Sequence, residues 1–211
     1  KLLDGMQKEN AIRVVKNAMV LTARETDPCT YMDENSFRLY ALERGISIAI
    51  FGMVPSRQMP LESYVGYTAF KNGLPVSYGG AWIFGKRANF GINIFTPYRS
   101  GESAFIMAQL LRIYRHVFTL HYFEVEPYQY GLDNPDGIAS GAFWFYYRFG
   151  FRPLDKHLKD IAQLEAQKIS SRKGYRTSPK VLTAFTASNI GLRLGDYTPP
   201  AVTDIAVKVT S

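Results

Sequence analysis

The feature that most constrains the fold is a change in the spacing of apolar residues in the middle of the chain. Residues 106–117 carry apolar side chains at helical spacing, whereas the segments on either side, 89–95 and 120–125, have the pattern of β-strands. A helix that connects two strands of one sheet returns the chain to the end of the sheet where the first strand began. The second strand then runs parallel to the first. We therefore expect the strands around Ile92 and Phe123 to be parallel neighbours.

Strand-like segments also precede this helix, and short turns separate them. Asn72-Gly73 is typical of a tight hairpin, which makes the strands before and after it antiparallel. The sequence thus predicts a mixed α/β fold with a mostly antiparallel sheet and one parallel crossover pair. The four strands expected before the helix are residues 46–54, 61–70, 75–84 and 89–95.

Both flanks of this core are predicted to be helical extensions. Residues 6–26 carry apolar side chains at helical spacing, and residues 36–44 are expected to form a second, shorter helix. Beyond the core, residues 154–169 have the pattern of a charged amphipathic helix, and one more helix is expected near residues 181–188 within a less regular tail. The expected parts are an N-terminal helical element (1–45), a core (46–153) and a C-terminal helix and tail (154–211).

The charge of the chain favours an anionic partner. Its formal net charge is +7 at pH 7, which would attract nucleic acid, an acidic membrane or a phosphorylated cofactor. The basic residues are dispersed along the chain, which argues against nucleic acid as the partner. The nearest approach to a cluster is Lys168, Arg172, Lys173 and Arg176.

Cysteine and histidine are too few to build a framework of disulfides or a metal site. The single Cys29 excludes an internal disulfide, and the three scattered histidines have no metal-ligand spacing. No apolar run reaches the roughly 18 residues that span a bilayer. With 211 residues, 46% of them apolar, the chain can bury one sizeable core. We expect a metal-free cytoplasmic protein with no membrane partner.

A turn suited to an anion lies between the fourth predicted strand and the long helix. It runs from Phe95 to Ala104, with the sequence FTPYRSGESA, and leads directly into a helix N-terminus. Free backbone N–H groups and the positive end of the helix dipole bind anions at such a place. Arg99 would add a positive charge, and Gly101 would let an anion approach the backbone. A capped helix also forms without a ligand, so this segment alone leaves both interpretations open.

The second informative segment is an aromatic helix that ends at a glycine. Residues 142–149 are predicted to be helical, Gly150 to end the helix in the left-handed conformation, and Phe151 to enter the core as an extended segment. The aromatic residues 144–147 have two interpretations. They fill a core, as aromatic residues at helical spacing usually do, or one of the tyrosines faces a reaction centre.

In this order, and with the crossover between them, the two segments resemble motifs of the GNAT superfamily of acyl-CoA-dependent N-acetyltransferases. The resemblance covers about residues 63–153. The family's first loop, Arg/Gln-x-x-Gly-x-Gly/Ala, is similar to the segment from Arg99 to Ala104, except that Glu102 stands where the family has its central glycine. The family's later motif, Ala-x-x-x-Tyr-x-x-x-Gly-Phe, is matched by Ala142, Tyr146, Gly150 and Phe151.

The resemblance implies a donor site for acetyl-CoA or another acyl-CoA as co-substrate, with an amine as acceptor and no metal. A splayed sheet would admit the pantetheine arm beside the backbone of Phe95. Tyr146 would be the acid that protonates the departing thiolate, since a phenol with a pKa of about 10 is neutral at physiological pH. The pyrophosphate would be held by Arg99 and by the segment Ser100, Gly101, Glu102, Ser103 and Ala104.

A general base for the incoming ammonium is harder to name. The fourth predicted strand carries no carboxylate, whereas Glu124 and Glu126 share one face of the fifth strand or its end by alternation. We take Glu124 as the candidate, acting directly or through water; the alternative is a solvated strand residue. The polar loop that contains Asp133, Asn134 and Asp136 either recognises the acceptor or forms an ordinary turn.

Three functions are consistent with the sequence. The first is an N-acyltransferase that uses acyl-CoA. The second is a non-catalytic, GNAT-like module of a longer chain that senses CoA or binds another protein, which Glu102 and the lack of a clear base favour. The third is an aminoacyl-tRNA-dependent transferase on a similar fold, which would use the net charge of +7 to hold RNA, although no basic tract supports it.

Overall fold

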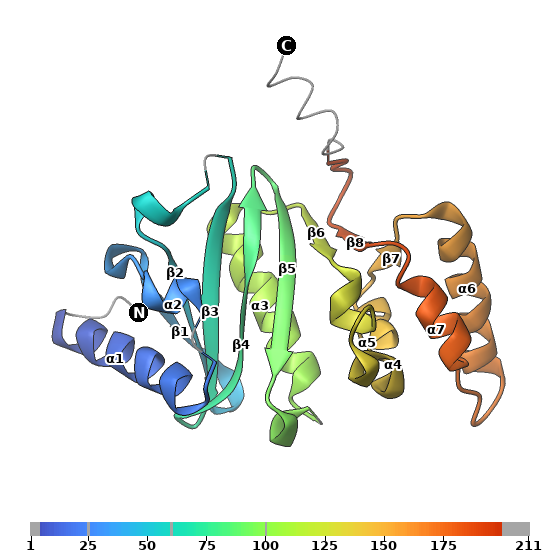
Figure 1. Cartoon of the computed structure of the whole chain (residues 1–211), viewed down its shortest axis with the longest axis horizontal. Helices are drawn as coiled ribbons and strands as arrows, with labels where there is room; N and C mark the ends of the chain where they lie inside the picture. The colour runs from blue at the N-terminus through green and yellow to red at the C-terminus, as the bar shows by residue number, and fades with distance from the viewer. Residues whose placement is uncertain (1–4, 25, 60, 100, 200–211) are drawn as a thin grey trace, which may run out of the picture. The chain divides into compact units, whose positions relative to one another are not determined.

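The computed structural model of the chain describes residues 5–24, 26–59, 61–99 and 101–199 and divides into two compact units (Figure 1). Of the described residues, those up to 84 and 90–117 form the N-terminal unit, and 85–89 and those from 118 onward form the C-terminal unit. Both units combine helices with strands, so the division differs from the three parts expected from the sequence. No helix within the described ranges is long and apolar enough to cross a membrane.

The strands of the N-terminal unit follow one another in the order β1-β2-β3-β4-β5. The first four pair antiparallel, and the hairpin between β3 and β4 turns at Asn72 (φ 50°) and Gly73 (φ 84°), the two positive φ angles of a type I′ turn. The structure therefore confirms the four predicted strands and the predicted hairpin. The bounds are β1 Arg38–Ala41, β2 Ile46–Gly52, β3 Ser63–Lys71, β4 Leu74–Phe84 and β5 Arg87–Ile94.

Strand β1 replaces the short helix predicted over residues 36–44. Arg38 pairs with Ile50 and Ala41 with Ser47, so the segment is an edge strand of β2, flanked by single turns of 3-10 helix. Four residues are too few for helical and alternating patterns to be told apart, and pairing with a neighbouring strand decides the outcome. The break expected after residue 26 also holds a short helix, α2 (Asp27–Thr30).

Helices cover both faces of the strands in the N-terminal unit. On one face, Ile12, Val15 and Met19 of α1 (Gly5–Leu21) share an apolar cluster with Phe51 and Phe70. Helix α3 (Ser103–Phe118), which Figure 1 shows on the far side of the strands, confirms the predicted long helix. The hydroxyl of its Tyr114 donates to the backbone O of Val65 at 2.8 Å, and the Tyr114 ring packs edge-on against Tyr67.

The C-terminal unit contains the predicted parallel pair. The first three residues of β5 pair in parallel with β6 (Tyr122–Val125): Arg87 with Tyr122, Ala88 with Phe123 and Asn89 with Glu124. This register ends at Asn89, whereas β5 continues to Ile94. The prediction of a mixed α/β fold, mostly antiparallel with one parallel crossover, is therefore confirmed.

The segment after residue 174, expected to be a less regular tail, contributes a strand to this unit. Strand β8 (Ile190–Arg193) lies between β6 and β7 (Arg152–Pro153) and is antiparallel to both. A glycine is needed in it, because a Cβ on Gly191 would lie 2.2 Å from the Tyr122 hydroxyl. The described part of this unit also contains a 3-10 turn (Pro127–Tyr130) and four α-helices: α4 Pro135–Ser140, α5 Ala142–Arg148, α6 Lys156–Ser171 and α7 Pro179–Phe185.

The aromatic helix α5 ends as predicted. Gly150 has φ 98°, its N–H donates to the Tyr147 carbonyl at 3.0 Å, and the N–H of Phe151 reaches back to the Tyr146 carbonyl at 3.3 Å. The ring of Phe143 stacks on Phe185 of α7, with 4.1 Å between the ring centroids. Of the five aromatic residues of α5, Phe143 and Tyr146 are buried and fill a core, whereas Trp144, Phe145 and Tyr147 are half-buried.

A buried carboxylate on α6 is linked to α5 through hydrogen bonds. The Trp144 indole Nε1 donates to Thr177 Oγ1 at 3.1 Å, in the segment between α6 and α7. Glu165, only 4% exposed, accepts from Lys168 Nζ at 2.7 Å and from the Tyr175 hydroxyl at 2.8 Å. Burial alone would raise the pKa of Glu165, but the hydrogen bonds from Lys168, Tyr175 and Thr177 outweigh it and hold that pKa below its ordinary value.

The first testable prediction concerns Glu165. Because its pKa is lower in the folded state, its charged form stabilises the fold above the unfolded pKa of about 4.3, and this contribution disappears as pH falls through the folded pKa. Urea denaturation of Glu165→Gln should therefore give a free energy of unfolding about 2 kcal/mol below wild type at pH 7, with a deficit that shrinks below about pH 5. The exposed control Glu62→Gln should show neither effect. A deficit that grows toward low pH would contradict the prediction.

Candidate functional site

The predicted anion-binding turn lies at the end of β5 in the N-terminal unit. A turn of 3-10 helix (Thr96–Tyr98) follows Phe95, Gly101 has φ 80°, and α3 begins at Ser103. The first helical hydrogen bond runs from the N–H of Ile106 to the carbonyl of Glu102 at 2.9 Å. The N–H groups of residues 103–105 therefore precede the helical ladder and are directed out of the helix end, where an anion can accept them.

Arg99 and Gly101 differ in what they bring to this turn. Arg99 is exposed, and its Nε donates to the backbone O of Ile94 at 3.1 Å, which orients the guanidinium at the end of β5. A Cβ on Gly101 would meet no atom within 4 Å, so the glycine is needed for its positive φ and not for space. The Ser103 hydroxyl closes the turn by donating to the Arg99 carbonyl at 2.7 Å. Ser100, predicted to contribute, lies outside the described residues.

The backbone of Phe95 is already engaged in hydrogen bonds. Its N–H donates to the Val76 carbonyl at 3.0 Å, and its carbonyl accepts from the N–H of Tyr98 at 2.8 Å. A carbonyl oxygen has two lone pairs, so the Phe95 oxygen can accept one more bond whereas its N–H cannot donate elsewhere. Within the backbone of Phe95, only the carbonyl is therefore able to make the pantetheine contact predicted from the resemblance.

Glu102 is held by a lysine that the sequence did not indicate. Its Oε1 forms an ion pair with Nζ of Lys71, the last residue of β3. The hydrogen bond from Lys71 is the main cause that lowers the pKa of Glu102, and the charge of Arg44 adds to it. The carboxylate that departs from the family pattern is thus neutralised by a cation 31 residues away in the chain.

In the C-terminal unit, Tyr146 of α5 is 2% exposed, and its ring contacts Tyr130, Phe145 and Phe151. Its hydroxyl donates to Gln129 Oε1 at 3.3 Å. Burial raises the pKa of Tyr146 far above that of an ordinary tyrosine, and Tyr130 contributes in the same direction. The hydroxyl is therefore neutral at every physiological pH, as predicted. Its hydrogen-bond partner, Gln129, was not predicted from the sequence.

Glu124 is buried. The alternative left open by the sequence, a solvated side chain on a strand, is therefore wrong. At 6% exposure, its Oε1 accepts from Asn189 Nδ2 at 2.6 Å and its Oε2 lies 3.1 Å from Arg87 Nη2. Glu126 is exposed and accepts from Asn89 at 2.6 Å. Both oxygens of Glu124 are thus engaged with groups from β5 and from the residue before β8.

Tyr130 lies between the two predicted catalytic residues. Its ring centroid is 6.4 Å from that of Tyr146, and its hydroxyl donates to the backbone O of Ser188. Burial and then the charge of Glu124 raise the pKa of Tyr130. The same two causes raise the pKa of Tyr122 to about 12. Tyr146 and Glu124 therefore share one neighbourhood of the C-terminal unit, whereas Phe95, Arg99 and the start of α3 belong to the N-terminal unit.

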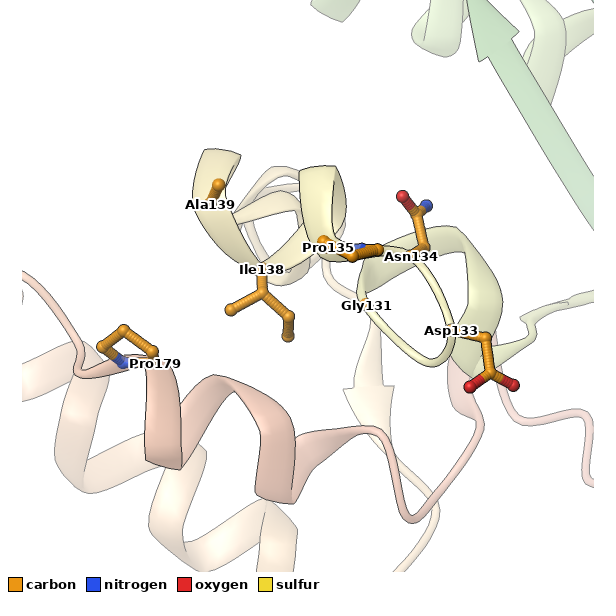
Figure 2. A pocket seen from close by; sticks show the side chains of 7 residues that line it. All are labelled: Gly131, Asp133, Asn134, Pro135, Ile138, Ala139 and Pro179. Atoms are coloured by element: carbon orange, nitrogen blue, oxygen red, sulfur yellow. The ribbon is translucent and has the colours of Figure 1, made fainter.

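A cavity of about 430 Å³ lies between α4 and the start of α7 (Figure 2). Ile138 points into it, and Asp133, with φ 50°, lies at its edge. Asn134, which also lines the cavity, caps α4: its side chain accepts from the Gly137 N–H at 3.3 Å and donates to the Tyr128 carbonyl at 2.9 Å. The lining residues are Gly131, Asp133, Asn134, Pro135, Ile138, Ala139 and Pro179.

Comparisons with known proteins give distant likenesses only. No family model and no curated protein matches the chain. Campylobacter jejuni N-acetyltransferase PseH is 11% identical, with a TM-score of 0.38 over 62% of this chain and 67% of its own. A protein described as a phosphinothricin N-acetyltransferase is 13% identical, with a TM-score of 0.40 over 93% and 98%. A variant of the cAMP-binding acyltransferase from Mycobacterium smegmatis is 6% identical, with a TM-score of 0.40 over 99% and 60%. At these identities and TM-scores, the likenesses do not assign an activity.

The second testable prediction concerns the buried pair of Arg87 and Glu124. Arg87→Met would leave the Glu124 carboxylate buried without a cation, and we expect the free energy of unfolding to fall by about 3 kcal/mol. Adding Glu124→Gln should recover part of this loss, because the second change removes the uncompensated charge. Urea denaturation at pH 7 measures both. The exposed control Arg176→Met should change stability by less than about 0.5 kcal/mol; an equally small change for Arg87→Met would contradict the prediction.

Proposed function

We propose that this protein is a GNAT-type N-acyltransferase that moves an acetyl or other acyl group from acyl-CoA to an amine. The observation that carries the proposal is the arrangement along β5. This strand pairs in parallel with β6 for three residues, continues past the end of that pairing, and leads through the Arg99 turn into α3. The resemblance at Ala142, Tyr146, Gly150 and Phe151, on a helix that ends as that motif predicts, adds to it.

The donor would be held by the start of α3 and by Arg99. The first-turn N–H groups of Ser103 and Ala104 offer hydrogen bonds to a pyrophosphate, and the exposed Arg99 supplies positive charge beside them. We assign Gly101 and Glu102 to the same loop through their backbone. The carbonyl of Phe95 would accept from an amide of the pantetheine arm.

In the proposed reaction the amine nitrogen attacks the thioester carbonyl, a C–N bond forms, the C–S bond breaks, and the ammonium loses a proton to a base. The Tyr146 hydroxyl would donate a hydrogen bond to the departing thiolate. Because the pKa of its buried phenol is raised well above that of a thiol, about 8.5 for cysteine, Tyr146 would stabilise the thiolate by a hydrogen bond and would not transfer its proton outright. The hydroxyl would turn from Gln129 toward the sulfur.

Glu124 remains the candidate base, although its two carboxylate oxygens already have partners. Both carboxylate oxygens are engaged, so Glu124 would have to take a proton through water at the expense of its bond to Asn189 or its pairing with Arg87. The same pairing favours a second candidate function. A chain that holds acyl-CoA but has no free base would sense CoA or bind another protein without catalysing transfer.

The third testable prediction concerns the donor site. Calorimetric titration of acetyl-CoA should show binding to the wild type and a Kd about 10- to 100-fold higher for Arg99→Ala, because a charge-assisted hydrogen bond to phosphate is lost. The control Arg24→Ala changes an exposed arginine after α1 and should bind as the wild type does. Absence of binding to the wild type at millimolar acetyl-CoA would refute the donor site.

The fourth testable prediction separates catalysis from sensing. In an assay of free thiol released from acetyl-CoA with a panel of amines, Tyr146→Phe should lower kcat by about 10²-fold or more and leave the Kd for acetyl-CoA nearly unchanged. Glu124→Gln should lower kcat to a similar degree if Glu124 is the base, and should leave kcat unchanged if the residue only pairs with Arg87. Equal kcat for wild type and Tyr146→Phe would remove Tyr146 from the mechanism.

A further inference from the structure

Three segments of the N-terminal unit bring charged side chains together beside the start of α3. Lys71 ends β3, Glu102 immediately precedes α3, and Arg44 lies in the 3-10 turn between β1 and β2. Lys71 and Glu102 form an ion pair whose side chains are 29% and 24% exposed. The Arg44 guanidinium lies over the ring of Phe105, in the first turn of α3, at 4.5 Å from its centroid.

The backbone fixes the two cations relative to each other. The N–H of Asn72, next to Lys71, donates to the carbonyl of Gly45, next to Arg44, at 2.8 Å. A Cβ on Gly45 would lie 1.9 Å from Asn72 Oδ1, so the turn and the hairpin are in close contact. Arg44 itself has φ 60°, a conformation that costs a non-glycine residue energy unless its surroundings hold it there. The positions of Lys71 and Arg44 are therefore set before any ligand arrives.

The cluster carries more positive than negative charge. Lys71 pairs with Glu102, and the charge of Arg44 acts on the same carboxylate, beside a helix N-terminus that is itself positive. Glu102 Oε2 is buried and has no hydrogen-bond partner among the described residues, so the carboxylate is poorly satisfied where it lies. Glu102 is thus an anion of the protein itself, and a more negatively charged group could take its place at Lys71.

We propose that Lys71, with Arg44, binds a phosphate monoester of the nucleotide ligand, and that Glu102 occupies Lys71 until that phosphate displaces it. The exchange is favourable only for a group more negative than a carboxylate. A phosphate monoester carries a charge of about −1.5 to −2 at pH 7 and three acceptor oxygens, whereas each phosphate of a pyrophosphate diester carries about one negative charge, as Glu102 does. The inference rests on the proposed function for the ligand: CoA carries one such monoester, on its ribose.

The test compares acetyl-CoA with 3′-dephospho-acetyl-CoA, which lacks the monoester, by calorimetry. The wild type should bind acetyl-CoA about tenfold more tightly than the dephospho form, and Glu102→Gln should widen this ratio by removing the internal anion. Lys71→Met/Glu102→Gln avoids an unpaired carboxylate and should lose most of the preference for acetyl-CoA, keeping only what Arg44 contributes. Lys71→Arg should keep the preference, and thermal denaturation checks that each variant is folded.

The outcomes separate this inference from the proposed function. A folded double variant that retains the wild-type preference, or loses affinity for both ligands by the same factor, would overturn the role of Lys71 while leaving the donor site in place. A wild type that binds neither ligand would overturn both. A higher affinity of the wild type than of Glu102→Gln for acetyl-CoA would show that Glu102 does not compete for Lys71, and would also overturn the inference.

Discussion

The buried carboxylate of Glu124 is the interaction on which the arrangement of the C-terminal unit depends. An isolated charge in an apolar interior is strongly unfavourable, so Glu124 requires partners, and it finds them in Arg87 at 3.1 Å and Asn189 at 2.6 Å. These come from the start of β5 and from the residue before β8, while Glu124 itself lies on β6. One side chain thus joins β5, β6 and the residue that precedes β8, so the β5–β6 pairing and the position of β8 beside β6 both bring partners to Glu124.

From this centre the hydrogen bonds continue to the motif helix. Tyr130 is the last residue of the 3-10 turn Pro127–Tyr130 that follows β6. Its hydroxyl donates to the carbonyl of Ser188, next to Asn189, and its ring packs against Tyr146. A second link starts at Trp144 of α5. Its indole N–H donates a hydrogen bond to Thr177, which in turn hydrogen-bonds to the buried Glu165. The orientation of α5 is therefore set from two directions. This fixed, apolar setting is also what raises the pKa of Tyr146 and makes it a hydrogen-bond donor in the proposed reaction.

Local patterns predicted most of this fold, because hairpins, long strands and helix ends are encoded in adjacent residues. Asn72-Gly73 and Gly150 each adopt the positive φ that their predicted turns require. Strands β1 and β8 were missed, since four-residue segments of this kind have no decisive period and pairing decides their conformation: β1 pairs with the adjacent β2, and β8 pairs with β6, which lies far before it in the chain. The polar partners were missed for a related reason: Glu124 and Asn189 are 65 residues apart, so nothing beside either one indicates the other. Tyr146 could be predicted and Gln129 could not, because the motif names the phenol but not its acceptor.

Glu102 shows how such a distant partner alters the meaning of a single residue. Taken alone, a carboxylate at the central position of an anion-binding loop would repel the ligand. With Lys71 beside it the pair is neutral, and Arg44 and the helix dipole leave the neighbourhood positive. An incoming phosphate is then not repelled, but it has to open the Lys71–Glu102 ion pair. Because this pair is partly exposed, opening it costs little free energy. A departure from a family motif is consequently weak grounds for lost binding until the residue that compensates it has been sought in the fold.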